Sequence, residues 1–114
     1  MIQYEQGVML RIFTGHQDRY EGKALFEHIV LKAKELHLAG VTVTRGIMGY
    51  GAHSKIHSAK ILRLSEDLPI IIEIVDSEEN LDKIIPCLEE CISDGFATIE
   101  KVNVIRYRSK AGSN

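Results

Sequence analysis

The sequence predicts an α+β domain in which a four-stranded antiparallel sheet carries two helices on one face. Three observations support this fold class. Four segments alternate apolar residues with the period of two that is expected for strands. Two longer segments carry apolar residues at helical spacing. Along the chain these segments follow the order strand, helix, strand, strand, helix, strand.

The first half of the chain supplies a strand, a helix and a second strand. Residues 8–14, VMLRIFT, alternate as a strand with apolar residues on both faces. Residues 23–38 carry apolar positions at helical spacing, and we expect Gly40 to end this helix because glycine readily adopts the left-handed conformation. Valine and threonine alternate in residues 41–45, which predicts the second strand.

The second half begins with isoleucine-rich segments and a capped helix. Residues 61–64 and 69–75 predict one long interrupted strand or two short strands. Asp76 or Ser77 can cap the helix that follows, with Glu79 reaching back as in a capping box.

The chain then returns to the sheet. We expect Pro86 to kink or break the second helix, because proline lacks an amide donor and crowds the preceding turn. A turn at Asp94-Gly95 leads into a last strand over residues 97–107. The resulting order is the split βαβ, or ferredoxin-like βαββαβ, arrangement. It leaves one sheet face without helices, and a subunit interface is expected there. The apolar residues expected on that face are Met9, Phe13, Ile71 and Val75.

The composition is that of an ordinary globular protein, with 114 residues of which 45% are hydrophobic and 26% charged. We expect residues 1–114 to form a single domain. The longest apolar run is far shorter than the roughly 20 residues that cross a bilayer, and the N-terminal residues lack a signal-peptide pattern. Cys87 and Cys91 are too few for a disulfide framework and are expected to be buried thiols rather than a redox pair. These features predict a cytoplasmic protein.

The formal net charge of −2 conceals an uneven distribution. Residues 66–100 hold most of the acids and a single base, Lys83, whereas residues 45–63 and 101–110 hold bases and no acid. If the two basic segments meet, they form one local anion site. A duplex nucleic acid would require a broader basic face, so nucleic acid is not an expected partner.

Residues 46–60 form the predicted functional loop. Its glycines let backbone amides approach an anion closely, and its histidines and lysines add donors. In the last strand, Arg106 and Arg108 are expected on one face, and arginine suits phosphate because its planar fork donates two parallel hydrogen bonds. Gly22-Lys23, before the first helix, is a weaker candidate for an anion.

Four runs of residues carry a resemblance to a known family: residues 20–23 (YEGK), 44–51 (TRGIMGYG), 65–76 (SEDLPIIIEIVD) and 104–108 (VIRYR). They resemble an uncharacterised PII-like family, the domain of unknown function numbered one hundred and ninety. Through that family the chain resembles the PII nitrogen-regulatory signalling proteins. The resemblance implies a homotrimer that binds an adenine nucleotide of the AMP, ADP or ATP type in clefts between subunits, with the loop reporting occupancy to a partner.

The resemblance also implies roles for single residues. It places Gly49 and Gly51 where the mobile loop leaves the sheet and Arg106 and Arg108 on the nucleotide phosphates. This chain has Phe96 where PII proteins carry a lysine, which favours a monophosphate or diphosphate. Tyr50 lies at the root of the loop, so the uridylylation known in some PII proteins is not implied. Together with the loop donors, the candidate nucleotide-binding residues are Arg45, Gly46, Gly49, Gly51, His53, Lys55, Arg106 and Arg108.

Other functions stay open. A metal-responsive trimer, like the copper-tolerance proteins, could use His53 and His57 with a third ligand from His16, His28 or His37. We expect no metal ligands, because solvated loop histidines are far more common. No catalytic constellation is found, so an enzyme acting on a nucleotide or small phosphate ester is the weaker alternative. No tightly bound cofactor is expected. Magnesium and a membrane transporter or channel partner remain open.

Overall fold

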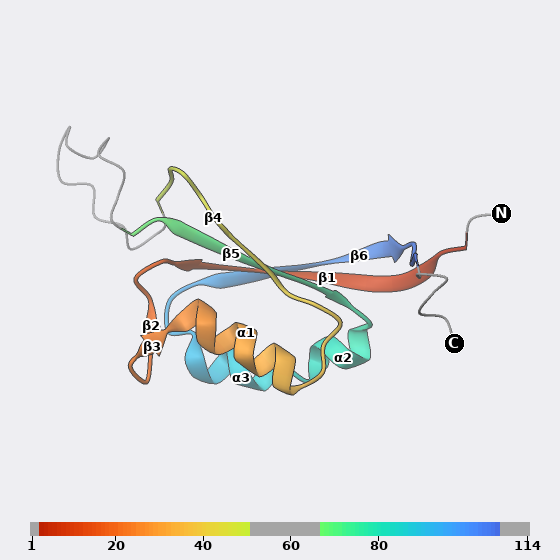
Figure 1. Ribbon diagram of the computed structural model, residues 1–114, viewed down its shortest axis with the longest axis horizontal. Coiled ribbons are helices and arrows are strands. Elements are labelled where there is room, and N and C mark those ends of the chain that lie inside the picture. The colour runs from red at the N-terminus through yellow and green to blue at the C-terminus, as the bar shows by residue number, and fades with distance from the viewer. Residues whose placement is uncertain (1–2, 51–66, 108–114) are drawn as a thin grey trace.

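One antiparallel sheet and a layer of helices make up the protein in the computed structural model, which describes residues 3–50 and 67–107. The sheet strands are β1 (Glu5–Gly15), β4 (Thr42–Arg45), β5 (Pro69–Asp76) and β6 (Phe96–Val104), and a small hairpin is formed by β2 (Arg19–Tyr20) and β3 (Lys23–Ala24). The helices are α1 (Leu25–Glu35), α2 (Glu78–Asp82) and α3 (Ile85–Cys91). The sheet order is β4-β5-β1-β6, with the helices on one face (Figure 1). The predicted ferredoxin-like fold is confirmed.

The core lies between the sheet and the helices. Alternation along β1 and β5 turns every second side chain toward the helices, so Leu10, Ile12 and Ile72 are at most 1% exposed. From the helical layer, Ile29 of α1 and Ile84 are completely buried against them. Burial of such aliphatic side chains, each contributing roughly 1.5–3 kcal/mol, is the main favourable term for this packing.

The first helix ends earlier than the sequence predicts. His37, rather than Gly40, adopts the left-handed conformation, with a φ of 61°. The amide of His37 donates to the carbonyl of Lys34 at 3.0 Å, and the amide of Leu38 donates to that of Ala33 at 3.0 Å. This is a Schellman ending, in which two otherwise unpaired carbonyls gain donors. The prediction for Gly40 is therefore wrong.

The second helical segment is divided, as the proline predicts. α2 is capped by Ser77, whose side chain accepts a hydrogen bond from the amide of Asn80 at 3.1 Å. Asn80 occupies the third helical position, where a capping box would need Glu or Gln, and its side chain binds Asp76 at 3.0 Å instead. The predicted role of Glu79 is therefore not seen among the described hydrogen bonds. α3 begins afresh, with Pro86 in its first turn.

The sheet face away from the helices is only partly apolar. Four apolar residues lie on this face as predicted, because along β1 and β5 they alternate with the buried residues that face the helices. They are Met9, Phe13, Ile71 and Val75. Between them, however, Arg11 Nε lies 2.6 Å from Glu73 Oε2, and its Nη1 lies 3.6 Å from Glu100 Oε1. This charged row crosses three strands, so the expected contiguous apolar face is interrupted.

Two further expectations concern segment ends. The predicted strand over residues 61–64 lies outside the described residues. The last strand covers Phe96–Val104 and ends before Arg106, although the sequence predicts that Arg106 lies within it. Among the helices that the structure describes, none is long and apolar enough to cross a membrane.

Candidate functional site

The base of the predicted loop packs against Pro69 at the start of β5. The amide of Gly46 donates to the carbonyl of Pro69 at 2.8 Å. A Cβ atom on Gly46 would lie 2.6 Å from the Pro69 ring, and one on Gly49 would lie 3.1 Å from it. Gly46 is thus needed for close packing on Pro69, and Gly49 packs tightly on the same ring, apart from any role in binding an anion. The side chains beside them are apolar and strongly exposed: Ile47 is 87%, Met48 65% and Tyr50 71% exposed.

Arg106 lies just beyond β6 and already has an acidic neighbour. Its Nη2 donates to Glu5 Oε2 at 3.2 Å, with both side chains about half exposed. The sequence segment around Arg106 contains no acid, but pairing of β6 with β1 brings Glu5 to it. The guanidinium is accessible and balanced by an exposed carboxylate.

The two halves of the predicted anion site lie at opposite ends of the sheet (Figure 1). In the ladder, Glu5 pairs with Val104 at one end of β1, and Gly15 pairs with Pro69 at the other. The ten-residue separation along β1 corresponds to roughly 30 Å at the rise of a strand. One chain therefore does not bring Arg106 to the base of the loop.

Half of the candidate nucleotide-binding residues can be located. Arg45 is the last residue of β4 and is exposed, and Gly46 and Gly49 follow it at the loop base. Those outside the described residues are Gly51, His53, Lys55 and Arg108. The histidine pair of the alternative metal hypothesis, His53 and His57, lies outside them too.

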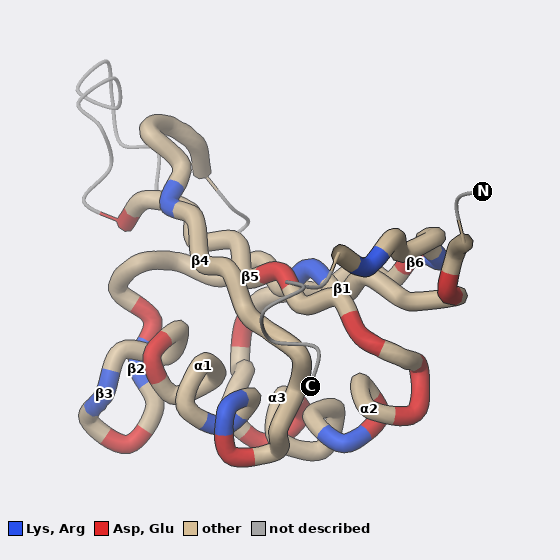
Figure 2. The backbone as a smooth tube through the Cα atoms, turned by 45° about the vertical axis from the view of Figure 1, so that its right-hand side comes forward, with Lys and Arg blue, Asp and Glu red and all other residues tan. Residues whose placement is uncertain are grey.

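Across residues 3–50 and 67–107, charge is distributed without a broad basic face. In Figure 2, lysines and arginines of the described residues are scattered among acids, and acidic positions gather around α2. Those around α2 are Asp76, Glu78, Glu79 and Asp82.

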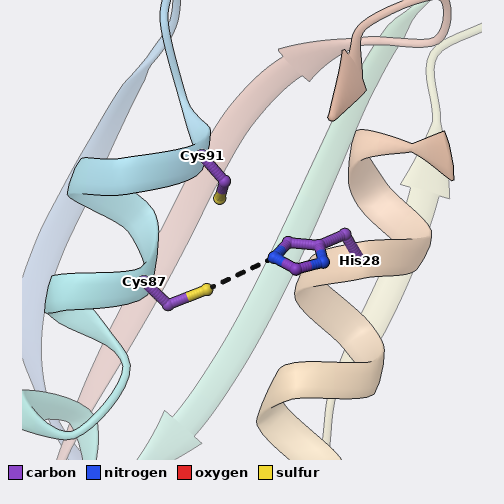
Figure 3. A group of neighbouring side chains, drawn as sticks. All are labelled: His28, Cys87 and Cys91. Carbon is purple, nitrogen blue, oxygen red and sulfur yellow. Dashed lines mark hydrogen bonds between the residues drawn. The ribbon is translucent and has the colours of Figure 1, made fainter. Parts of the chain in front are cut away.

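A second cluster of side chains that could bind a ligand, His28, Cys87 and Cys91, lies between α1 and α3. His28 projects from α1, and Cys87 and Cys91 project toward it from successive turns of α3 (Figure 3). His28 Nε2 lies 3.8 Å from Cys87 Sγ, and one ligand atom from each residue lies within 4.8 Å of the others. Both cysteines are free, with Cys91 5% and Cys87 9% exposed. Burial raises the pKa of Cys87, and it raises that of Cys91 to about 12.

The imidazole of His28 is supported by an aromatic neighbour. The ring of Tyr20, in β2, lies 4.6 Å from the ring of His28. The hydroxyl of Tyr20 donates to Glu90 Oε1 at 3.0 Å, and this hydrogen bond raises the pKa of Tyr20 to about 12. The β2–β3 hairpin thus contacts the His28 ring through Tyr20, and it ties Glu90 to the same tyrosine.

The sequence predicts the burial of both cysteines correctly but does not reveal their histidine partner. The spacing of Cys87 and Cys91 indicates that they share a helix face. That they lie close to His28, however, depends on how α1 and α3 pack against each other on one face of the sheet. A histidine among the apolar positions of α1, beside Leu25 and Ile29, is the one available signal that it faces inward.

Known proteins resemble this chain over most of its length. The DUF190 family model, described as "Uncharacterized ACR, COG1993", matches residues 7–104. The UPF0166 protein MJ1524 of Methanocaldococcus jannaschii is 40% identical over 99 residues, covering 86% of this chain and 91% of that protein. A UPF0166 protein of Aquifex aeolicus is 39% identical over 99 residues, which cover 85% of this chain and 91% of the Aquifex protein.

Solved structures share the fold at lower identity. TTHA0516 of Thermus thermophilus, named as PII-like, superposes with a TM-score of 0.63 at 22% identity, over 91% of this chain and 94% of its own. CPII of Thiomonas intermedia, a nitrogen regulatory PII-like protein bound to ADP, AMP and bicarbonate, superposes with a TM-score of 0.61 at 18% identity. The match covers 93% of this chain and 94% of CPII. TTHA0516 is named as a signalling protein and CPII as a nitrogen regulatory protein, and neither name describes an enzyme. The chain therefore belongs to the DUF190 (UPF0166) family and has the PII-like ferredoxin fold.

Proposed function

We propose that this protein is a PII-like regulatory protein in which residues 1–114 act as one domain and bind an adenine nucleotide between subunits. The observation that carries the proposal is the separation of Arg106 from the base of the loop, about ten residue steps along β1. A head-to-tail ring sets one end of a protomer against the other end of the next. A homotrimer of this kind would complete the site once at each boundary, in the cytoplasm.

The ligand chemistry follows from the charges at the two ends. Arg106 offers a planar fork to phosphate oxygens, and Glu5 occupies one of its donors in the free protein. The residue after Gly95 is Phe96, whose ring stacks on Phe13 at 4.7 Å and carries no charge. Fewer phosphate contacts favour AMP or ADP over ATP. CPII was solved with ADP and AMP, which supports the same class of ligand.

The loop over residues 46–60 is the proposed reporter of occupancy. When a phosphate draws Arg106 of one protomer toward the loop base of the next, the loop population shifts toward one conformation. The exposed apolar side chains of Ile47, Met48 and Tyr50 give a partner a surface to read. A membrane transporter or channel is the partner class that we propose. Magnesium is proposed only as a companion of the phosphates.

The experiment is calorimetry with AMP, ADP, ATP and cyclic AMP, with and without magnesium, on the untagged full chain. Hydrogen bonds to charged groups contribute roughly 1.5–3 kcal/mol, so Arg106→Ala should weaken binding about 10- to 150-fold. Arg19→Ala removes an exposed arginine from β2 and should leave binding unchanged. Sedimentation should give a trimer. Absence of heat with every nucleotide, or equal affinity in the Arg106 variant, would refute the proposal.

A second variant tests the competition at Arg106. Glu5→Gln removes the carboxylate that holds the guanidinium in the free protein. An exposed pair contributes about 0.2–1 kcal/mol, so nucleotide affinity should rise by up to about fivefold at low salt and less at high salt. An affinity that falls in this variant would show that Glu5 itself is needed by the ligand.

A further inference from the structure

His28, Cys87 and Cys91 have the geometry of three ligands around one ion. In a tetrahedral zinc site with bonds of about 2.3 Å to sulfur and about 2.0 Å to nitrogen, neighbouring ligand atoms lie about 3.5–3.8 Å apart. The distance from Cys87 Sγ to His28 Nε2 is 3.8 Å, and one ligand atom from each residue falls within 4.8 Å of the others. Small side-chain rotations, without backbone movement, would complete the first coordination shell.

The donor set selects the kind of cation. Two thiolates and an imidazole are soft ligands that suit zinc, whereas calcium and magnesium require oxygen. Spacing of i and i+4 on α3 sets both sulfurs on one helix face, turned toward α1 (Figure 3). The thiols are nearly buried, and His28 is half-buried, so a route from solvent passes beside the imidazole.

Neighbouring residues support the imidazole without competing for the ion. The ring of Tyr20 packs against His28 at 4.6 Å and limits its rotation. The nearby carboxylate of Glu90 accepts the hydroxyl of Tyr20 at 3.0 Å. Three protein ligands leave a fourth position for water or a small solute, which is the composition of an open zinc site.

We propose that His28, Cys87 and Cys91 bind one Zn²⁺ ion per chain and so join α1 to α3. This site lies in the helical layer and is independent of the proposed nucleotide cleft. It differs from the histidine pair of the loop, because its ligands belong to helices that the structure describes. The ion would hold α1 and α3 at a fixed spacing and make the stability of the helical layer depend on zinc.

The test uses the untagged full chain with His53→Ala and His57→Ala, so that loop histidines do not contribute. Metal-free protein is titrated with Co²⁺, whose bond to thiolate gives a near-ultraviolet charge-transfer band. We expect one Co²⁺ per chain, displaced by one Zn²⁺. Cys87→Ser and Cys91→Ser should abolish the band, and His28→Ala should weaken binding at least tenfold. His37→Asn, at the end of the same helix, is the matched control and should bind normally.

The half-buried His28 keeps the proposal testable even if the cysteine variants fail to fold. Circular dichroism of the metal-free His28→Ala protein establishes that it is folded. Zinc should raise the thermal midpoint of the starting protein and of the His37 control but not that of His28→Ala. Absence of a thiolate band, or equal zinc stabilisation of the His28 variant, would overturn the proposal, because a purely structural histidine would leave zinc affinity unchanged.

Discussion

Substitution of Gly95 should be unusually destabilising, because the chain enters β6 through a position that has no room for a side chain. Gly95 has a φ of +153°, which side chains rarely tolerate. A Cβ atom there would lie 2.8 Å from the carbonyl oxygen of Phe13 and 3.2 Å from Cγ2 of Ile92. Phe13 is held in the ladder between Ile71 and Phe96, so its carbonyl has little freedom to withdraw.

The magnitude follows from two contributions. Backbone strain at such a position is about 1–3 kcal/mol, and forcing an extra methyl group into a filled space adds about 1–3 kcal/mol. Gly95→Ala should therefore lower the free energy of unfolding by about 2–6 kcal/mol. Two other glycines separate these contributions. Gly22 has a φ of +81°, and a Cβ atom added to it would meet nothing within 4 Å, whereas Gly40 has open space and no unusual φ.

We expect the free energy of unfolding to be far lower in Gly95→Ala than in Gly22→Ala. In Gly40→Ala it should equal or exceed that of the starting protein. Gly22→Ala carries only strain, about 1–2 kcal/mol. Gly40→Ala should be neutral or stabilise by up to about 1 kcal/mol, because alanine restricts the unfolded chain. Urea unfolding followed by circular dichroism, at one fixed protein concentration, measures all three. If Gly95→Ala lies within experimental error of Gly40→Ala, the described entry into β6 is incorrect.

Three more predictions concern the core and two hydrogen-bonded groups. Ile72→Ala should lower the free energy of unfolding by about 2–5 kcal/mol, because its side chain is fully buried, whereas Val75→Ala on the open face should lower it by less than about 1.5 kcal/mol in the same urea experiment. Burial alone would raise the pKa of Asp76, but hydrogen bonds from Asn80 and two backbone amides outweigh it and lower the pKa below 3.8. The ionised form is therefore favoured by folding, and its stabilisation is complete above pH 4 to 5 and lost as pH falls through the depressed folded value. Asp76→Asn should consequently be less stable than the starting protein near neutrality, with the gap closing below about pH 4; a gap that widens on acidification would contradict this. The pKa of Tyr20 is raised to about 12 by its hydrogen bond to a carboxylate, so removing that acceptor should bring the ultraviolet titration of this tyrosine toward 10.

Sequence patterns are reliable where one local feature decides the structure. The alternation in β1 and β5 predicts which isoleucines are buried, and Pro86 predicts the division of the second helix. Prediction fails where more than one residue could end a helix, as His37 and Gly40 could for α1. His37 ends α1 because the turn after it gains two backbone hydrogen bonds, and a non-glycine residue in the left-handed conformation gives no clear signal in a sequence.

The candidate sites are harder to predict because they depend on pairing between distant segments. Glu5 reaches Arg106 only through the β1–β6 register, so the tail looks free of acids in the sequence. His28 of α1 lies beside two cysteines of α3, and β4, β5 and α2 separate these two helices along the chain. The composition of the loop suggests that its glycines serve anion binding, whereas Gly46 is also needed for close packing on Pro69.

The position of β6 at the margin of the sheet has a consequence for how the protein behaves when diluted. Beyond β6 the described residues supply no further strand, so one line of its peptide groups has no partner from the sheet. A margin of this kind recruits another extended chain unless something covers it. A neighbouring copy that covers β6 in an assembly would protect the protein from fibrous association. Once protomers are separated from such an assembly, we expect them to aggregate instead of persisting as soluble monomers.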